Sequence, residues 1–316
     1  MNLESSLVII IVTHFSSLYP GEKSTPRTPV LHLYFSINII HFISKTKLVR
    51  PPFFNAIIEQ TIQSQDRSFD MSNYKIIIAY DGTRYRGWQR LTNGADTIQG
   101  KLENVLSRMT GEEIQVIGAG RTDGGAHARA QVANFHTKFK TNPTEIFKYC
   151  AEYLPKDITL VSVKDAAPRF HARFHAISRR YVYQIRTGLT PNPFENQYRL
   201  HIAEALDVAL MEEAATYLMG HHDFSSFTSR KSKTKPNERT ITRLEILRDG
   251  NNLDIVCEAD GFLHNMVRII TGTLIEVGLG KVKPSDVKQI LSEKVRADAG
   301  YTVPSHGLFL DEVLFD

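Results

Sequence analysis

Hydrophobic side chains from residue 71 onward recur with two periods, one of two residues and one of about 3.6 residues. The shorter period is typical of strands and occurs over 74–81, 113–120, 130–137, 157–167 and 176–188. The longer period predicts helices over 97–111, which ends at a glycine, and over 142–155, where Asn142 suits the cap and Pro143 the first turn. The resulting order β-α-β-β-α-β is that of a ferredoxin-like unit.

The C-terminal part repeats this alternation. The pattern predicts helices over 205–220, 261–280 and 283–294, a hairpin over 239–260 that turns near Asp249-Gly250-Asn251, and a closing strand over 307–315. The helix over 261–280 is apolar nearly all round, so we expect it to be buried. The prediction is an α+β protein with two ferredoxin-like halves, 71–180 and 181–316, a largely antiparallel sheet and a central cleft.

Residues 1–70 break this regularity. The stretches "STPRTP" and "VRPPF" interrupt any periodic pattern, and the apolar run "LVIIIV" is too short for a signal peptide. We predict that 1–70 is an extension outside the fold, either disordered or not part of the natural product. No apolar run approaches the ~20 residues of a membrane span, so no membrane partner is expected.

Composition narrows the class of protein. The net charge of +4 allows a nucleic-acid partner without requiring one. The two cysteines, Cys150 and Cys257, can build neither a disulfide framework nor a zinc motif, which fits a reducing, cytoplasmic compartment.

A glycine-rich stretch, "GAGRTDGGAHARAQVANF" over 118–135, holds the most unusual charge pattern. It resembles a dinucleotide-binding loop, but Asp123 stands where the third glycine of that fingerprint should be, and a strand pattern follows where a helix is needed. A carboxylate there would also repel pyrophosphate. A nucleotide-dependent oxidoreductase is therefore disfavoured.

Asp123 lies among cations, with Arg121 and His127 close by and Arg129 a little further on. By itself an Asp before Gly is most often a turn residue that bonds its own backbone. Arg268 changes this interpretation, because a guanidinium in the buried helix needs a partner. A structural salt bridge to Glu258 or Asp260 would satisfy it, but pairing with Asp123 would also keep the carboxylate ionised.

Other candidates each have an ordinary structural explanation. Tyr181 shares one strand face with Tyr183 and Ile185, as a core residue would, yet its ring could stack on a base with Arg179 and Arg180 beside it for phosphates. The basic loop "RKSKTKPNER" over 230–239 is either simply solvated or guides a polyanion. The two histidines of "HARFH" over 171–175 lack a third ligand, so no metal site is predicted, and the zinc-deaminase signature is absent.

Several ordered blocks together resemble a known family. The stretch "GRTDGGAHA" is similar to the G-R-T-D-A-G-V-H-A signature of the tRNA pseudouridine synthase A family, with Gly124 in place of Ala and Ala126 in place of Val. The blocks "YDGTRYRGWQR", "RFHARFHAISRRYVY", "HDFSSF", "GFLHNMVR" and "HGLFL" resemble the family's other blocks in the same order, so the resemblance covers 71–316.

The resemblance implies a role for each matched position. Asp123 matches the catalytic nucleophile, and Arg121 the arginine that helps to draw the base out of the stem. Tyr181 matches the tyrosine that stacks on the target uracil, Arg268 the partner of the catalytic acid, and Leu308 an apolar residue of the uracil pocket.

The resemblance also implies the pseudouridine synthase fold and a homodimer. It implies isomerisation of uridine to pseudouridine at positions 38 to 40 of the tRNA anticodon stem-loop, with no cofactor and no metal. A non-catalytic RNA-binding protein on ferredoxin-like halves is the alternative, and loss of the acid would favour it. Because Asp123 is present, the enzyme is the preferred hypothesis.

Overall fold

A computed structural model describes residues 71–230 and 236–316. The predicted extension over 1–70 and the middle of the basic loop, 231–235, lie outside the described residues. The described residues belong to a single compact unit. None of the helices within this part of the chain is long and apolar enough to cross a membrane.

The N-terminal half follows the predicted order of elements. They are β1 (Ser72–Tyr80), α4 (Ile98–Thr110), β2 (Ile117–Gly118), β3 (His127–Thr137), α5 (Pro143–Tyr153) and β4 (Ile158–Ala166). Side-chain oxygens cap both helices, since Thr97 accepts from the backbone N–H of Gly100 and Asn142 from that of Glu145. Gly111 ends α4 in the left-handed region, at φ 72°, as the sequence predicts.

The predicted boundary between residues 180 and 181 falls within β5, so the C-terminal half is counted from Ala176 and contains the remaining elements. They are β5 (Ala176–Thr187), β6 (Leu200–Ile202), α6 (Val208–Thr216), β7 (Gly220–Asp223), β8 (Glu238–Asp249), β9 (Asn252–Ala259), α7 (Met266–Gly278), α8 (Asp286–Glu293) and β10 (Leu308–Phe315). The predicted hairpin is formed by β8 and β9, whose last register pair, Asp249 with Asn252, encloses Gly250 at φ 57°. Helix α7 is buried along most of its length, as its apolar sequence predicts.

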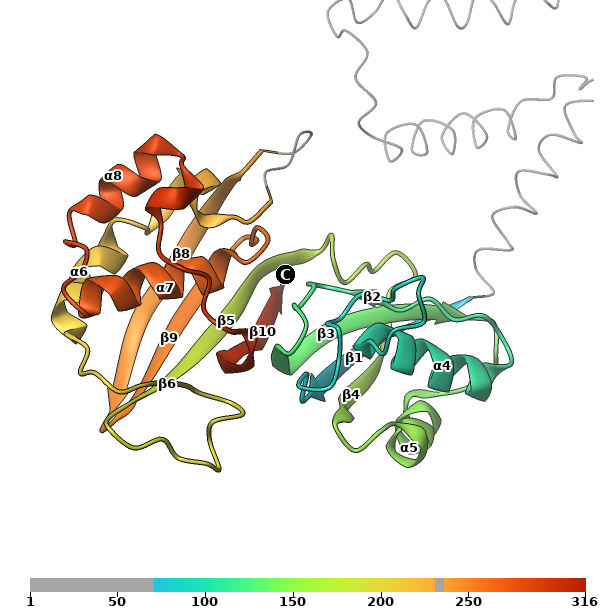
Figure 1. Ribbon diagram of the computed structural model, residues 1–316. Helices are drawn as coiled ribbons and strands as arrows, with labels where there is room; N and C mark the ends of the chain where they lie inside the picture. The colour runs from blue at the N-terminus through green and yellow to red at the C-terminus, as the bar shows by residue number, and fades with distance from the viewer. Residues whose placement is uncertain (1–70, 231–235) are drawn as a thin grey trace, which may run out of the picture. The chain divides into compact units, whose positions relative to one another are not determined.

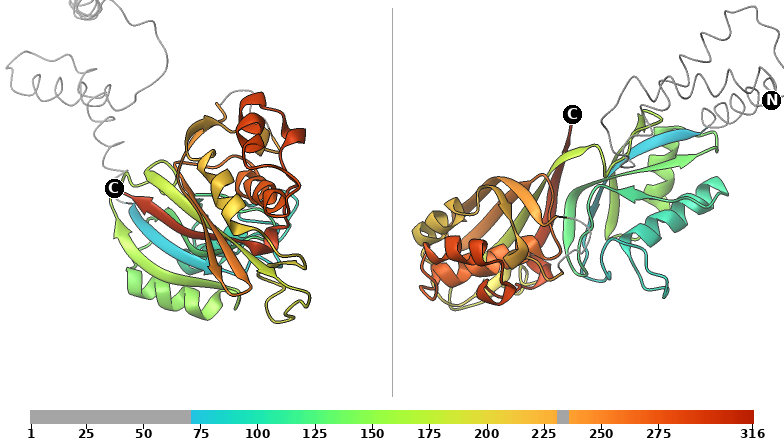
Figure 2. Two further views of the ribbon diagram at one scale, coloured as in Figure 1. Left: turned by 90° about the vertical axis from the view of Figure 1, so that its left-hand side faces the viewer. Right: turned by 90° about the horizontal axis from the view of Figure 1, so that it is seen from above.

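One continuous sheet joins the two halves. Its strand order is β4-β1-β3-β10-β5-β9-β8-β7, with β2 on β3 and β6 on β5. The pairs are antiparallel except β10 with β3 and β5 with β6. Helices α4 and α5 lie beside the end of the sheet formed by β1, β3 and β4. Helices α6, α7 and α8 lie beside the end that contains β8 and β9 (Figure 1). Viewed from above, β10 runs between the two groups of helices (Figure 2). The predicted α+β class and largely antiparallel sheet are confirmed.

The predicted strand over 113–120 is almost entirely irregular. Only Ile117–Gly118 pair with β3. At Val116, side chains of α4 satisfy the hydrogen-bonding groups of the backbone. Glu103 Oε1 accepts from the N–H of Val116 at 3.0 Å, and Gln99 Nε2 donates to the carbonyl of Val116 at 3.1 Å. A backbone satisfied in this way does not need a ladder.

Two predicted helices are shorter than their patterns. The helix over 205–220 ends at Thr216, because Gly220, at φ 93°, begins β7 and pairs with Ile241 of β8. The helix over 261–280 begins only at Met266, since Asn265 adopts a left-handed φ of 62°. Residues 261–265 therefore form a loop that precedes α7.

Candidate active site

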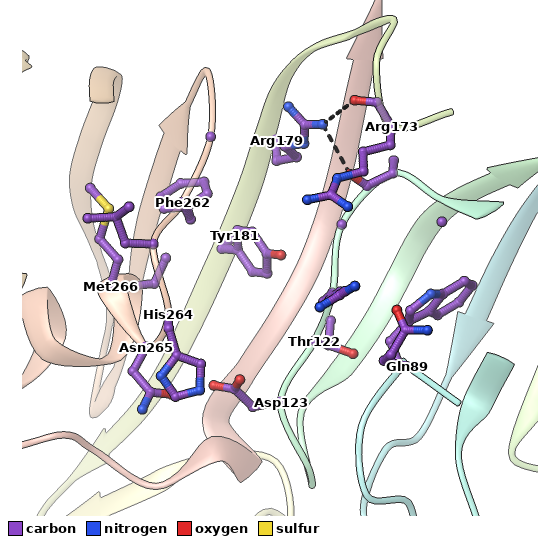
Figure 3. A pocket seen from close by; sticks show the side chains of 18 of the residues that line it. Gln89, Thr122, Asp123, Arg173, Arg179, Tyr181, Phe262, His264, Asn265 and Met266 are labelled. Carbon is purple, nitrogen blue, oxygen red and sulfur yellow. Dashed lines mark hydrogen bonds between the residues drawn. The ribbon is translucent and has the colours of Figure 1, made fainter. Parts of the chain in front are cut away.

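A cavity of about 1000 Å³ is lined by residues from both halves. The N-terminal half contributes the loop 117–123, which contains Asp123, and the turn at 171–174. The C-terminal half contributes Arg179 and Tyr181 of β5, the loop 260–265, the first turn of α7, and Leu308 at the start of β10. The cavity is the central cleft that the sequence predicts. Figure 3 shows Asp123, Tyr181 and Phe262 around it.

The loop that carries Asp123 is fixed by the turn over 82–88. The backbone N–H of Trp88 donates to the carbonyl of Thr122 at 3.1 Å, and that of Gly125 donates to the carbonyl of Tyr85 at 3.1 Å. A Cβ at Gly82 would lie 1.8 Å from the carbonyl oxygen of Ala126, so only glycine fits there. The block "YDGTRYRGWQR" therefore serves as the support of the Asp123 loop, a role that its own sequence pattern does not reveal.

Asp123 and Arg268 are in contact. Arg268 Nη1 donates to Asp123 Oδ2 at 3.0 Å, and the same nitrogen lies 3.0 Å from Asn265 Oδ1. Arg268 Nε donates to the carbonyl of Val303 at 2.7 Å, which fixes the plane of the guanidinium. Side-chain exposures of 29% for Asp123 and 17% for Arg268 place the pair at the cavity wall, neither sealed off nor fully solvated.

The alternative partners of Arg268 are engaged elsewhere. Glu258 accepts from Ser178 Oγ at 2.9 Å, and Asp260 accepts from the backbone N–H of Thr240 at 3.1 Å. In the turn of Asp123, its carbonyl accepts from the N–H of Ala126 at 3.1 Å. The backbone therefore closes the turn, while the carboxylate is free to meet Arg268 and the cavity.

Tyr181 forms part of the cavity wall. Its ring is only 6% exposed and meets the edge of Phe262, with ring centroids 5.0 Å apart at 84°. Burial, with a smaller contribution from the negative charge of Asp123, raises the pKa of the Tyr181 phenol, so the hydroxyl stays protonated at neutral pH. Tyr183, one step along the same face of β5, is fully buried and donates to the carbonyl of Pro304, so it is a core residue.

The remaining matched residues also border the cavity. Arg121 is exposed, two residues before Asp123. Leu308 is 5% exposed and lies opposite Tyr183 in the β10–β5 ladder. The structure thus brings Arg121, Asp123, Tyr181, Arg268 and Leu308 to one cavity.

Two of the basic residues near Asp123 in the sequence have other roles. His127 is buried and does not line the cavity; its Nδ1 accepts from the N–H of Gly82 at 3.1 Å and its Nε2 donates to the carbonyl of His306 at 3.0 Å. Burial lowers the pKa of the His127 ring and outweighs the opposing effect of the Asp81 carboxylate, whose Oδ1 lies 3.1 Å from Nδ1. Arg129 pairs with Asp311 at 3.0 Å.

The prediction that Arg179 and Arg180 lie together for phosphates is wrong for Arg180. Alternation along β5 places it on the opposite face from Tyr181, where it pairs with Asp311 at 3.0 Å and with Glu312 at 2.7 Å. Arg179 does line the cavity, but its guanidinium donates to backbone carbonyls of four residues, Ala119, Arg173, Ala176 and Asp260. It braces the cavity wall across the two halves, which no local sequence signal predicts.

Comparison with known proteins identifies the family of the chain. The fold is that of a pseudouridine synthase, with the acid in a cleft between two halves. The family model described as tRNA pseudouridine synthase matches residues 76–175 and 214–316. The chain belongs to this family of RNA-modifying isomerases.

Curated relatives match over their whole length. A tRNA pseudouridine synthase A 2 of Bacillus cereus (strain ZK / E33L) is 44% identical over 245 residues, which are 78% of this chain and 100% of the relative. The tRNA pseudouridine synthase A of Bacillus sp. (strain KSM-64) is 46% identical, and tRNA pseudouridine synthase A 1 of Clostridium tetani (strain Massachusetts / E88) 45%, each with the same coverage. A solved archaeal box H/ACA sRNP Nop10-Cbf5 complex aligns at 10% identity and a TM-score of only 0.27, over 71% of this chain and 59% of that one.

Proposed function

We propose that this chain converts uridine to pseudouridine at positions 38 to 40 of the tRNA anticodon stem-loop, with Asp123 as the nucleophile. The observation that carries the proposal is the pairing of Asp123 with Arg268 at 3.0 Å in a cavity that Tyr181 also lines. The family and the named relatives support the reaction class. The resemblance of the motif blocks supports the anticodon stem-loop as substrate.

The chemistry requires an ionised acid in a partly enclosed site. Pseudouridine formation breaks the bond between N1 of uracil and C1′ of the sugar, and forms a bond from C5 to the same C1′. The hydrogen at C5 leaves to water, and N1 takes up a proton. A carboxylate acts here by covalent attack or by stabilising positive charge at the sugar, and both roles need the anion that Arg268 holds.

The surroundings of Asp123 suit a flipped base. Extrusion of a nucleotide from a stem costs a few kcal/mol. The Tyr181 ring and the apolar Leu308 side chain would replace the lost stacking, and the exposed Arg121 would bind the backbone as the base leaves. Because the Tyr181 phenol stays protonated, it adds no second negative charge beside Asp123.

Tritium release tests the reaction directly. With tRNA labelled at C5 of its uridines, the protein alone, without cofactor, should release tritium to water, because isomerisation replaces that hydrogen. Stem-loops labelled at only one uridine should release tritium from positions 38, 39 or 40 and from no other. Release from a different position would contradict the substrate assignment, and binding without release would favour the non-catalytic RNA-binding alternative.

Asp123→Asn tests the nucleophile. The amide keeps the shape and removes the charge, so tritium release should fall below detection while a filter-binding curve for tRNA stays near that of the parent, because most binding comes from Lys and Arg contacts to phosphates. Asp311→Asn is the matched control, since Asp311 also pairs with an arginine at 3.0 Å but lies outside the cavity. Appreciable turnover by Asp123→Asn would remove Asp123 from this role, and a loss of both tRNA binding and thermal stability would mean that it merely holds its turn.

The proposal includes a homodimer, as the family resemblance implies, and a cytoplasmic location. Cys150 and Cys257 are both free and buried, which suits a reducing compartment.

A further inference from the structure

A stacked aromatic pair lies at the cavity beyond the residues already assigned. The rings of His171 and Phe174 stack with centroids 4.1 Å apart at 27°, and both residues line the cavity. Phe174 is 76% exposed. The turn that contains them, 167–175, joins β4 to β5, and its residues His171, Arg173 and Phe174 line the cavity.

This turn is held in place by bonds to the rest of the protein. The N–H of Ala172, which is fully buried, donates to Asn134 Oδ1 at 2.8 Å. Arg179 Nη2 donates to the carbonyl of Arg173 at 2.9 Å, so the turn is anchored to the strand that carries Tyr181. The pair is therefore presented in a fixed orientation, which reduces the entropy lost when a ligand stacks on it.

The histidine ring is neutral. Its Nδ1 accepts from the backbone N–H groups of Arg173 at 3.2 Å and Phe174 at 3.3 Å. Burial lowers the pKa of the His171 ring, and the nearby Arg173 guanidinium lowers it further. Two flat, uncharged rings are consequently stacked on each other, with one Phe174 face open to solvent.

A single exposed phenylalanine is ordinary on a protein surface. Phe194, for example, is 89% exposed and lies outside the cavity. What distinguishes Phe174 is its place at the cavity beside Arg173, whose exposed guanidinium makes no hydrogen bond or ion pair within residues 71–230 and 236–316. In Figure 3 Arg173 and Asp123 lie toward opposite ends of the cavity, with Tyr181 between them.

We propose that the His171–Phe174 pair is a stacking platform for a nucleobase beside the target uridine, and that Arg173 binds a phosphate of the same strand. An aromatic face for the base and a free cation for the backbone are the two components of single-stranded RNA recognition. The platform rests on the proposed function in one respect, namely that the ligand is RNA. It adds a second contact point, so that the strand is held on either side of the flipped uridine.

Tryptophan fluorescence tests the stacking itself. The chain has one tryptophan, Trp88, which is 2% exposed, so the emission of the parent chain serves as a baseline. Phe174→Trp and Phe194→Trp, each combined with Asp123→Asn to prevent turnover, place a reporter at the platform and at a matched exposed site. Saturating tRNA should quench the emission added by Phe174→Trp and leave that added by Phe194→Trp unchanged. Equal quenching at both sites, or none at Phe174→Trp, would overturn the platform.

Affinity provides the second measurement. Phe174→Ala should weaken tRNA binding roughly tenfold, the loss expected for one base–aromatic stack, whereas Phe174→Tyr should bind like the parent and Phe194→Ala should show no change. Parent-like affinity of Phe174→Ala would contradict the proposal. Failure of the proposed function gives a different result, namely no tritium release by the parent even where Phe174→Trp is quenched by tRNA.

Discussion

At the scale of single residues, the geometry of Arg268 predicts that lysine cannot replace it. Its Nε donates to the carbonyl of Val303 while its Nη1 donates to Asp123. The single ammonium nitrogen of a lysine cannot make both hydrogen bonds in this geometry. We expect Arg268→Lys to lose turnover although the charge is kept, and Arg268→Ala to reduce kcat by about 10²-fold or more through misplacement of the acid.

The control for this prediction is Arg180→Ala. Like Arg268, Arg180 is partly buried and forms ion pairs, here with Asp311 and Glu312. It lies on the face of β5 opposite to Tyr181 and the cavity. Tritium-release kinetics and melting curves of the three variants should show a loss of turnover only at position 268. Normal turnover of Arg268→Ala would mean that the pairing does not serve the reaction.

At the scale of elements, α7 places Arg268 by packing closely against the segment that follows α8. A Cβ on Gly272 would lie 1.9 Å from the carbonyl oxygen of Tyr301, so Gly272→Ala must push the two apart. Overpacking of this kind costs about 1–3 kcal/mol of stability. Val303, whose carbonyl accepts from Arg268 Nε, lies two residues beyond Tyr301, so a shift of this segment would also displace Arg268. We therefore expect Gly272→Ala to lower both the melting temperature and kcat.

Gly280→Ala separates the two effects. Gly280 has φ 69° with open space around it, so alanine there strains the backbone without moving the site. We expect a lowered melting temperature with normal kcat. An equal loss of kcat in both variants would show that stability alone, and not the position of Arg268, limits the reaction.

At the scale of the whole molecule, residues 71–316 are expected to suffice for activity. The family model begins at residue 76, and 245 residues of this chain cover the full length of the named relatives. A chain that begins at Met71 should release tritium at the rate of the full chain and sediment with the mass of two chains. A large loss of activity or solubility would show that 1–70 belongs to the domain, and a monomer mass would contradict the homodimer.

The sequence alone determined the elements whose signals are local. The strands β1, β4 and β5, the capped helices α4 and α5, and the β8–β9 hairpin follow from periodicity, caps and turn residues that the chain carries within a few positions. That Arg268 needs an acidic partner could also be predicted, because a charge in an apolar helix requires one. The same argument allowed Glu258 or Asp260, and the choice of Asp123 came from the structure.

Only the tertiary structure decided those features in which a residue bonds to a distant segment of the chain and not to its sequence neighbours. Val116 is not in a strand because side chains of α4 satisfy its backbone, and α7 starts late because Asn265 turns left-handed beside the cavity. His127 lies a few residues after Asp123 and Arg180 lies beside Tyr181 in the sequence, yet their partners come from the C-terminal segment, namely His306 for His127 and Asp311 for Arg180. Alternation along a strand fixes which side chains share a face, but what meets them there depends on contacts between residues far apart in the chain, so no local pattern contains that information.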